Sequence, residues 1–214
     1  MTMERVLAKR SELHIKRRAW HITSGVIALT LYYTVEVSLW AFVILAGVIA
    51  ALGFLLDFKR FKNDRLNTSL NRFFGVIMRE SEKNSFSGLP FYALGVCLTF
   101  LFFPEKIAVL SFLFLIFADP MASIFGVRFG KDRLFPNKTL QGTMAAFITC
   151  LIVTVVYAGA LGVSSPNLII FTFFCSIAGA LSELLSAFNI DDNLTIPVVS
   201  GACMSLLNLW LQVF

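Results

Sequence analysis

The chain has 214 residues, of which 57% are hydrophobic and 14% are charged, and its formal net charge is +5. Soluble domains carry about 25% charged residues, so this composition excludes a soluble Rossmann enzyme, and its high apolar content excludes intrinsic disorder. The apolar runs are continuous rather than alternating at period two, which argues against a transmembrane β-barrel. We therefore expect an all-α polytopic membrane protein that forms one domain over residues 1–214.

Apolar runs along the chain predict about seven transmembrane helices, because one span needs about 20 mainly apolar residues. The runs cover roughly 19–35, 38–56, 88–103, 107–125, 140–161, 167–187 and 195–214. All but one of the 18 Lys and Arg residues lie before the first run, between the second and third, or between the fourth and fifth. Seven spans place these three segments on one side, which the positive-inside rule makes the cytoplasm. We expect a cytoplasmic N-terminus and a C-terminus on the far side.

The segment 57–87 is too polar to cross the membrane and too long for a simple turn. Its apolar residues recur at helical spacing with arginines between them, which is typical of an amphipathic helix on the inner leaflet. A helix packed on the cytoplasmic end of the bundle fits the same pattern. The apolar residues are Leu66, Leu70, Phe73, Phe74 and Ile77. Arg60 and Lys62, near the start of the segment, are expected to be inner-leaflet anchors only.

Acidic residues gather near the end of the chain, where the final third contains no Lys or Arg. These residues are Glu183, Asp191 and Asp192, and Asp119 is expected on the same side of the membrane. Charged groups at membrane depth cost a few kcal/mol each, and they normally pair or line an aqueous site. We expect these carboxylates, which have no local counter-ion in the sequence, to bind Mg²⁺, because Mg²⁺ prefers oxygen ligands. Solvated loop carboxylates are the alternative.

The segment 126–139 supplies positive charge that suits phosphate groups. Its basic residues are Arg128, Lys131, Arg133 and Lys138. Glycines in and after the segment would let backbone N–H groups approach phosphate oxygens, and these are Gly126, Gly130 and Gly142. Acid on one segment and base on another is the arrangement that a metal–nucleotide complex needs.

Two further groups of polar residues lie at membrane surfaces. Arg17 and His21 are four residues apart and therefore share one face of the first helix, and Glu12 precedes them. Glu82 lies shortly before the third apolar run. The plainer interpretations are arginine anchors, an interfacial histidine and a solvated loop charge.

The order of these motifs resembles the polyprenol kinase family, which includes dolichol kinase, phytol kinase and CTP-dependent diacylglycerol kinase. The matching segments are Glu12-Leu13 with Arg17–His21; Glu82 with Ser87-Gly88 and Tyr92–Gly95; Asp119–Gly126 with Phe129–Lys131 and Lys138–Thr143; and Glu183 with Asp192–Pro197. The resemblance covers essentially the whole chain. Arg18 stands where the family usually has Lys, and Pro120 where it usually has a small residue.

The resemblance implies a CTP-dependent kinase that phosphorylates a membrane lipid alcohol at the cytoplasmic face, with Mg²⁺ as cofactor. The alcohol would be a polyprenol or dolichol, phytol, a related isoprenoid alcohol, or diacylglycerol. The C-terminal half is also similar to CDP-diacylglycerol synthases, so a phosphatidate cytidylyltransferase is the alternative. A small transporter is disfavoured, because the ionisable groups gather at one face and no inverted repeat is evident. No nucleic-acid partner is expected, and the oligomeric state is open.

On this interpretation the candidate residues fall into four sets. The catalytic set is Asp119, Asp192, Lys131 and Glu82, in which Asp192 and Glu82 are alternative acceptors of the hydroxyl proton. The nucleotide-binding set is Arg128, Gly130, Lys131, Lys138, Thr139 and Gly142. The residues expected near the lipid headgroup are Glu12, Arg17 and His21. The metal-binding set is Asp119, Glu183, Asp191 and Asp192.

Overall fold

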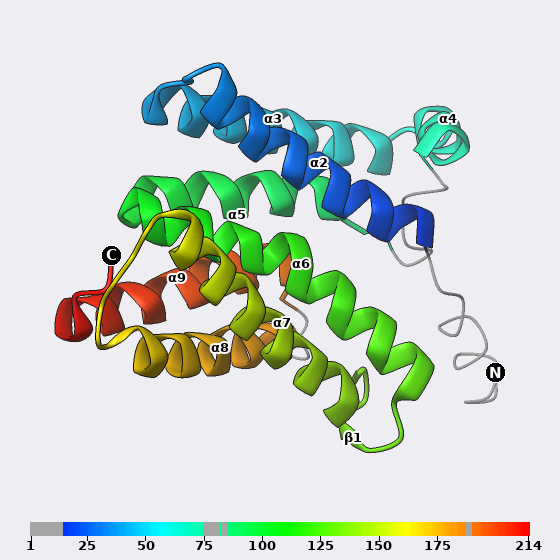
Figure 1. Ribbon diagram of the computed structural model, residues 1–214. Coiled ribbons are helices and arrows are strands. Elements are labelled where there is room, and N and C mark those ends of the chain that lie inside the picture. Colours follow the sequence, from blue (N-terminus) through cyan, green and yellow to red (C-terminus); the bar gives the residue numbers. More distant parts are fainter. Residues whose placement is uncertain (1–14, 75–81, 83–84, 187–189) are drawn as a thin grey trace.

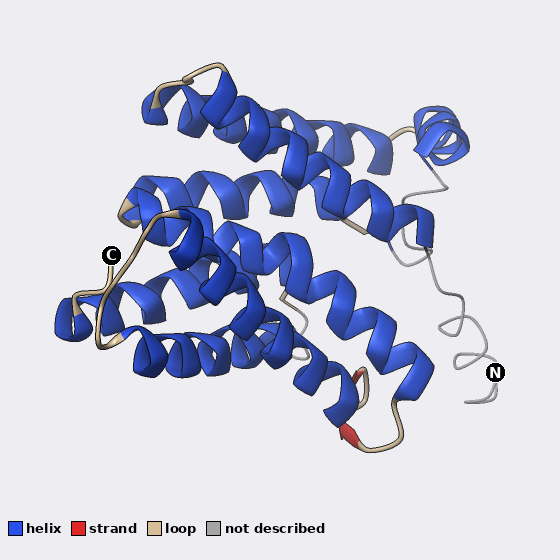
Figure 2. Cartoon of the chain, viewed as in Figure 1, coloured by secondary structure: helices blue, strands red, loops and turns tan. Residues whose placement is uncertain are grey.

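The computed structural model describes residues 15–74, 82, 85–186 and 190–214. Its elements are α2 (Ile15–Thr34), α3 (Leu39–Phe61), α4 (Asp64–Phe74), α5 (Gly88–Phe102), α6 (Glu105–Phe129), β1 (Arg133–Phe135), β2 (Lys138–Thr139), α7 (Leu140–Ala160), α8 (Leu168–Leu185) and α9 (Asp192–Leu211). Figure 2 shows that helices make up most of the described chain. The predicted all-α class is confirmed, and the antiparallel hairpin β1–β2 is an addition that the sequence did not predict.

Each predicted apolar run corresponds to one long helix, but several helices extend beyond the run. Helix α3 continues to Phe61 and so includes Asp57 and Arg60, which the sequence had placed in the following loop. These two side chains form an ion pair three residues apart on one helix face, and both are buried. Because each charge has its partner inside the protein, both side chains can be buried and the helix can continue past its apolar run.

Five of the helices, α3, α6, α7, α8 and α9, are long and apolar enough to cross a membrane. Helix α5 is apolar but has only 15 residues, and α2 begins with a charged turn that includes Lys16 and Arg17. The structure therefore confirms a polytopic membrane protein, and the number of seven spans stays a prediction.

Helix α6 is the central element of the bundle. It packs against α2, α5, α7, α8 and α9, and 67% of its most apolar stretch is buried, compared with 22% for α3. Figure 1 shows α2 and α3 on one side of α5 and α6, with α7, α8 and α9 on the other. Helix α3 therefore turns most of its surface outward, where large apolar side chains such as Trp40 and Leu52 are exposed, as expected of a lipid-facing helix.

Small residues bring the central helices close together. A Cβ atom added to Gly179 in α8 would lie 2.6 Å from the Cys150 sulfur in α7 and 2.8 Å from the Phe114 ring in α6. These contacts leave no room for any larger residue at position 179. Close approach through small residues is the usual way in which transmembrane helices pack.

The charged segments lie toward one end of the bundle. Helix α2 begins at this end, α3 ends there beside α4, and the β1–β2 hairpin joins α6 to α7 there, whereas the chain ends at the opposite end (Figure 1). This arrangement agrees with the predicted alternation. Which end faces the cytoplasm stays a prediction.

Helix α4 confirms that part of the segment 57–87 is helical. The Asn63 side chain starts it by accepting hydrogen bonds of 3.1 Å from the backbone N–H groups of Arg65 and Leu66. Ile77, the last residue of the proposed apolar face, lies outside the described residues. The position of α4 on a leaflet stays a prediction.

Candidate functional site

A carboxylate cluster forms where α6, α8, α9 and the hairpin meet. Glu183 in α8 is buried and forms an ion pair with Lys138 of β2. Asp119 of α6 and Asp192 of α9 are both close enough to act electrostatically on Glu183. The expectation of acids without a counter-ion was therefore wrong. The counter-ion is Lys138, which lies 45 residues earlier in the sequence and reaches Glu183 only because the hairpin folds against α8.

The two adjacent aspartates at the start of α9 have different surroundings. Asp191 is the N-cap, and its Oδ1 accepts hydrogen bonds from the backbone N–H of Asn193 at 3.0 Å and from the Asn193 side chain at 2.7 Å. Asp192 is the first residue of the helix and is buried. Asp192 acts electrostatically on Glu183, and Asp191 organises the start of the helix. Metal binding by either aspartate stays a prediction.

The glycines near the hairpin pack helices together. A Cβ atom on Gly142 would lie 2.8 Å from the Ala122 carbonyl oxygen and 3.2 Å from the Gly126 Cα, so α6 and α7 cross closely here. The backbone N–H of Gly142 donates to the Thr139 hydroxyl, which caps α7, at 3.2 Å. This geometry gives Gly126, Gly142 and Thr139 a structural role, and nucleotide binding by Thr139 and Gly142 stays a prediction.

The loop between α6 and the hairpin is fastened by one glutamine. The Gln141 side-chain oxygen accepts from the backbone N–H groups of Lys131 and Asp132 at 3.0 and 3.3 Å, and its amide donates to the Asp132 carboxylate at 2.7 Å. Gly130, which ends α6, donates to the carbonyl of Gly126. Three basic side chains in and beside this loop are exposed, namely Arg128 at the end of α6, Lys131 in the loop and Arg133 in β1. Nucleotide binding by Arg128, Gly130 and Lys131 stays a prediction.

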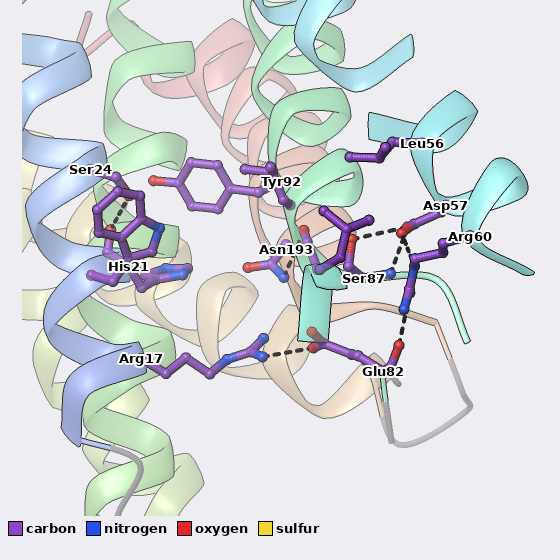
Figure 3. Close-up of a pocket in the computed structure, with 14 residues that line it drawn as sticks. Arg17, His21, Ser24, Leu56, Asp57, Arg60, Glu82, Ser87, Tyr92 and Asn193 are labelled. Carbon is purple, nitrogen blue, oxygen red and sulfur yellow. Dashed lines mark hydrogen bonds and ion pairs between the residues drawn. The ribbon is translucent and has the colours of Figure 1, made fainter. Parts of the chain in front are cut away.

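A second group of polar residues surrounds a cavity of about 170 Å³ between α2, α3 and α5. Arg17 of α2 donates to the Glu82 carboxylate at 2.7 Å, and Figure 3 shows this pair among the residues that line the cavity. His21, one turn along α2, also lines the cavity, and its Nε2 donates to the Leu115 carbonyl oxygen at 3.0 Å. The expectation that Arg17 and His21 share one face is confirmed. Glu12 lies outside the described residues.

The far wall of the cavity is a buried ion pair. Arg60 has only 1% of its surface exposed, and its Nε donates to the Asp57 carboxylate at 2.6 Å. Its Nη2 also donates to the carbonyl oxygens of Glu82, at 2.8 Å, and of Ser85. Asp57 accepts from the backbone N–H and hydroxyl of Ser87 at 2.8 and 2.9 Å. The expectation that Arg60 is an inner-leaflet anchor was wrong, because it is an internal connection between α3 and the residues before α5.

The cavity and the carboxylate cluster share two short stretches of chain. On α2, Arg17 faces the cavity, whereas the next residue, Arg18, donates to the Ser123 hydroxyl at 2.7 Å and interacts electrostatically with Asp119. On α9, Asn193 lines the cavity and contacts the carbonyl of Gly88 at 3.5 Å, directly after Asp192 of the cluster. The two groups are therefore adjacent parts of one site.

Comparison with known proteins identifies relatives over nearly the whole chain. The CTP-dependent diacylglycerol kinase 1 of Schizosaccharomyces pombe is 36% identical over 207 residues, which cover 90% of this chain and 93% of the relative. The protein of the same name from Saccharomyces cerevisiae is 30% identical, over 89% of this chain and 72% of the relative. The chain belongs to the CTP-dependent diacylglycerol kinase family. An uncharacterized protein of Rickettsia prowazekii is 28% identical over 89% of this chain. No family model and no solved structure matches this kinase-family chain.

Metal binding by the carboxylate cluster stays a prediction. Within the described part of the chain, no three His, Cys, Asp or Glu side chains come together closely enough to hold a metal ion. Mg²⁺ commonly takes only one or two protein carboxylates and completes its shell with waters and substrate phosphates. Asp119 and Asp192, which both act electrostatically on Glu183, are compatible with this requirement, whereas Glu183 itself is engaged by Lys138.

Sequence reasoning missed three parts of the candidate site, namely the Asp57–Arg60 pair, Ser87 as its partner, and Asn193. Opposite charges three residues apart at the end of a long apolar run are a signal that could have revealed the pair. The partners of Arg60 at Glu82 and Ser85 lie 22 and 25 residues away. No local pattern indicates them.

Proposed function

We propose that this kinase transfers the γ-phosphoryl group of CTP to the hydroxyl of diacylglycerol at the cytoplasmic end of the bundle, and that Mg²⁺ accompanies the nucleotide. The observation that carries the proposal is the identity with CTP-dependent diacylglycerol kinases along nearly the full length of both chains. The candidate site supports it, because the cavity and the carboxylate cluster both include residues from neighbouring positions of α2 and α9. A cytoplasmic orientation follows from the basic segments, which gather at this end.

The reaction needs an acceptor, a leaving group and a destination for one proton. The acceptor hydroxyl oxygen bonds to the γ-phosphorus, the bond from that phosphorus to the bridging oxygen breaks, and CDP leaves. The hydroxyl proton passes to a carboxylate, for which Asp192 and Glu82 are the candidates. Glu82 lines the cavity but is already engaged by Arg17, whereas Asp192 lies in the carboxylate cluster.

The remaining groups stabilise charge. Lys131 is exposed on the loop after α6, and Lys138 is held beside the carboxylates by Glu183. Both ammonium groups can balance negative charge that develops on the transferred phosphoryl group. When bound, Mg²⁺ would supply further neutralisation of the CTP phosphates. Asp119 and Asp192 are the residues proposed to hold it.

The decisive experiment supplies CTP labelled either at the γ-phosphate or at the α-phosphate to purified protein in nanodiscs. Diacylglycerol, dolichol, phytol and farnesol are offered separately. We expect the γ-label, and not the α-label, in the lipid, with CDP as coproduct, diacylglycerol as the best acceptor, and no transfer in the presence of a chelator of divalent cations. Release of pyrophosphate with α-label in the lipid would show a cytidylyltransferase instead.

A further inference from the structure

The charges that line the α2–α3–α5 cavity compensate each other. Among the described lining residues, the two cations are Arg17 and Arg60, and the two anions are Glu82 and Asp57. Each cation forms an ion pair with one anion, at 2.7 Å for Arg17 with Glu82 and 2.6 Å for Arg60 with Asp57 (Figure 3). The cavity is therefore polar but formally neutral when His21 is uncharged.

Part of the cavity lining is apolar and exposed at the protein surface. Trp20, Leu56 and Leu89 line it from α2, α3 and α5, and all three are exposed. The interior contributes hydrogen-bonding groups, including Ser24 and the Tyr92 hydroxyl. That hydroxyl is buried, lies near Ser24, and makes no hydrogen bond of normal geometry with the described protein. This arrangement matches an amphiphile whose small polar head contacts the hydrogen-bonding groups inside the cavity and whose apolar tail contacts the exposed apolar residues.

The size of the cavity limits what can enter it. Its volume of about 170 Å³ is close to that of an engineered cavity of about 150 Å³ that accommodates a benzene ring. A glycerol headgroup fits such a space, whereas acyl chains do not and would leave between the exposed apolar residues. The walls are also held in place, because Arg60 ties α3 to the carbonyl groups at residues 82 and 85.

We propose that this cavity is the acceptor site, and that its internal neutrality selects uncharged diacylglycerol over its charged product, phosphatidate. The proposal rests on the function proposed above and names the substrate site within it. A phosphomonoester carries about −1.5 to −2 charge at neutral pH, and burying a charge without a counter-charge is unfavourable. Both cations of the cavity are already paired with carboxylates, so no cation is available to the new phosphate. The product therefore leaves the site that the substrate occupied.

The position of the cavity suits this role, because it adjoins the carboxylate cluster along α2 and α9. Arg17 and Arg18 face the two regions from neighbouring positions, and Asp192 and Asn193 do the same. A headgroup hydroxyl in the cavity would therefore lie near the carboxylate cluster, because consecutive residues of α2 and of α9 contribute to both regions.

The test measures binding without turnover. Photoreactive diacylglycerol and phosphatidate with identical acyl chains are incorporated into phosphatidylcholine nanodiscs with the full-length protein, in the absence of CTP. Crosslinked peptides are then identified by mass spectrometry. We expect diacylglycerol to label the segments of α2, α3 and α5 around the cavity at least about tenfold more than phosphatidate does, because only the phosphate is left without a counter-charge.

A charge variant makes the test specific. Leu89→Lys adds one cation to the lining of the cavity and should raise phosphatidate labelling about three- to fivefold relative to diacylglycerol labelling. Leu101→Lys, on the exposed surface at the other end of α5, is the matched control and should change neither.

Equal labelling of the cavity by both lipids in the parent protein would overturn the proposal. Diacylglycerol labelling confined to the second, apolar pocket, which Leu181 and Leu185 of α8 and Val199 of α9 line, would also overturn it. The labelled-CTP assay separates the two proposals. Selective labelling of the cavity by diacylglycerol without transfer of the γ-label would support the cavity as a diacylglycerol-binding site and refute the kinase reaction. Transfer of the γ-label to diacylglycerol without labelling of the cavity would support the kinase reaction and refute the cavity as the acceptor site.

Discussion

The α2–α3–α5 cavity and the carboxylate cluster lie side by side, but their charged residues are arranged differently. The charges of the cavity are paired one to one, whereas acids predominate in the cluster. In the cavity, Arg17 and Arg60 each meet one carboxylate, and Arg60 is almost fully buried. In the cluster, Glu183 faces two further acids with one lysine as its ion-pair partner, and the cations of the neighbouring loop are exposed. The difference suggests two roles for the same residue types. The paired charges of the cavity hold its walls in place, whereas we propose that the acids of the cluster bind a divalent cation.

The first way to test this contrast is to remove the buried cation of the cavity. Arg60→Ala leaves the Asp57 carboxylate buried without its partner, so we expect the free energy of unfolding to fall by about 3–5 kcal/mol. Thermal unfolding in detergent measures the loss. Lys62→Ala, two residues later at an exposed position, is the control and should change stability by less than about 0.5 kcal/mol. Equal stability of the two variants would show that the ion pair does not hold the wall.

The carboxylate cluster should respond in turnover rather than in folding. Asp119→Asn, Asp192→Asn and Lys131→Ala should each lower kcat about a hundredfold or more, because each removes charge that we propose binds or stabilises the reacting phosphates. Thermal unfolding should remain close to that of the parent for Lys131→Ala, whose side chain is exposed. Turnover by all three variants at the level of Lys62→Ala would place the reaction elsewhere.

The packing that supports the cluster can be tested with two glycines of α7. Gly142→Ala should destabilise the protein by about 1–3 kcal/mol, because its Cβ would meet the Ala122 carbonyl oxygen at 2.8 Å. Gly159→Ala is the matched control, since no atom lies within 4 Å of its Cβ position, and it should be neutral or stabilising by up to about 1 kcal/mol. Denaturant titration followed by circular dichroism distinguishes the two. A loss as large for Gly159→Ala as for Gly142→Ala would refute the close crossing.

The smallest effect is expected from a conservative change in the cavity. Arg17→Lys keeps the charge opposite Glu82 but loses the planar fork of donors. The KM for diacylglycerol should rise about three- to tenfold, with kcat and the KM for CTP changed less. Initial rates at varied concentrations of each substrate measure this separation. An effect on the KM for CTP alone would assign Arg17 to the nucleotide side.

Hydropathy and charge predicted the helices and their alternation well, because each long apolar run must form a helix to satisfy its backbone groups in lipid. Several side-chain roles could not be predicted, because they depend on partners distant in sequence. Lys138 and Glu183 are 45 residues apart, and the carbonyl groups that hold Arg60 belong to another segment. The hairpin was missed because its strands have only three and two residues. The kinase family was indicated by motif order and was confirmed by the relatives.

The neighbouring arginines of α2 have a mechanical consequence. Consecutive residues of an α-helix point about 100° apart around its axis, because one turn holds about 3.6 residues. Arg17 and Arg18 therefore hold this helix in two directions, through Glu82 on one side and Ser123 on the other. Helix α2 cannot rotate about its axis without loosening at least one of these contacts. A rotation of α2 would therefore alter the cavity wall at Arg17 and the surroundings of Asp119 at Arg18 together.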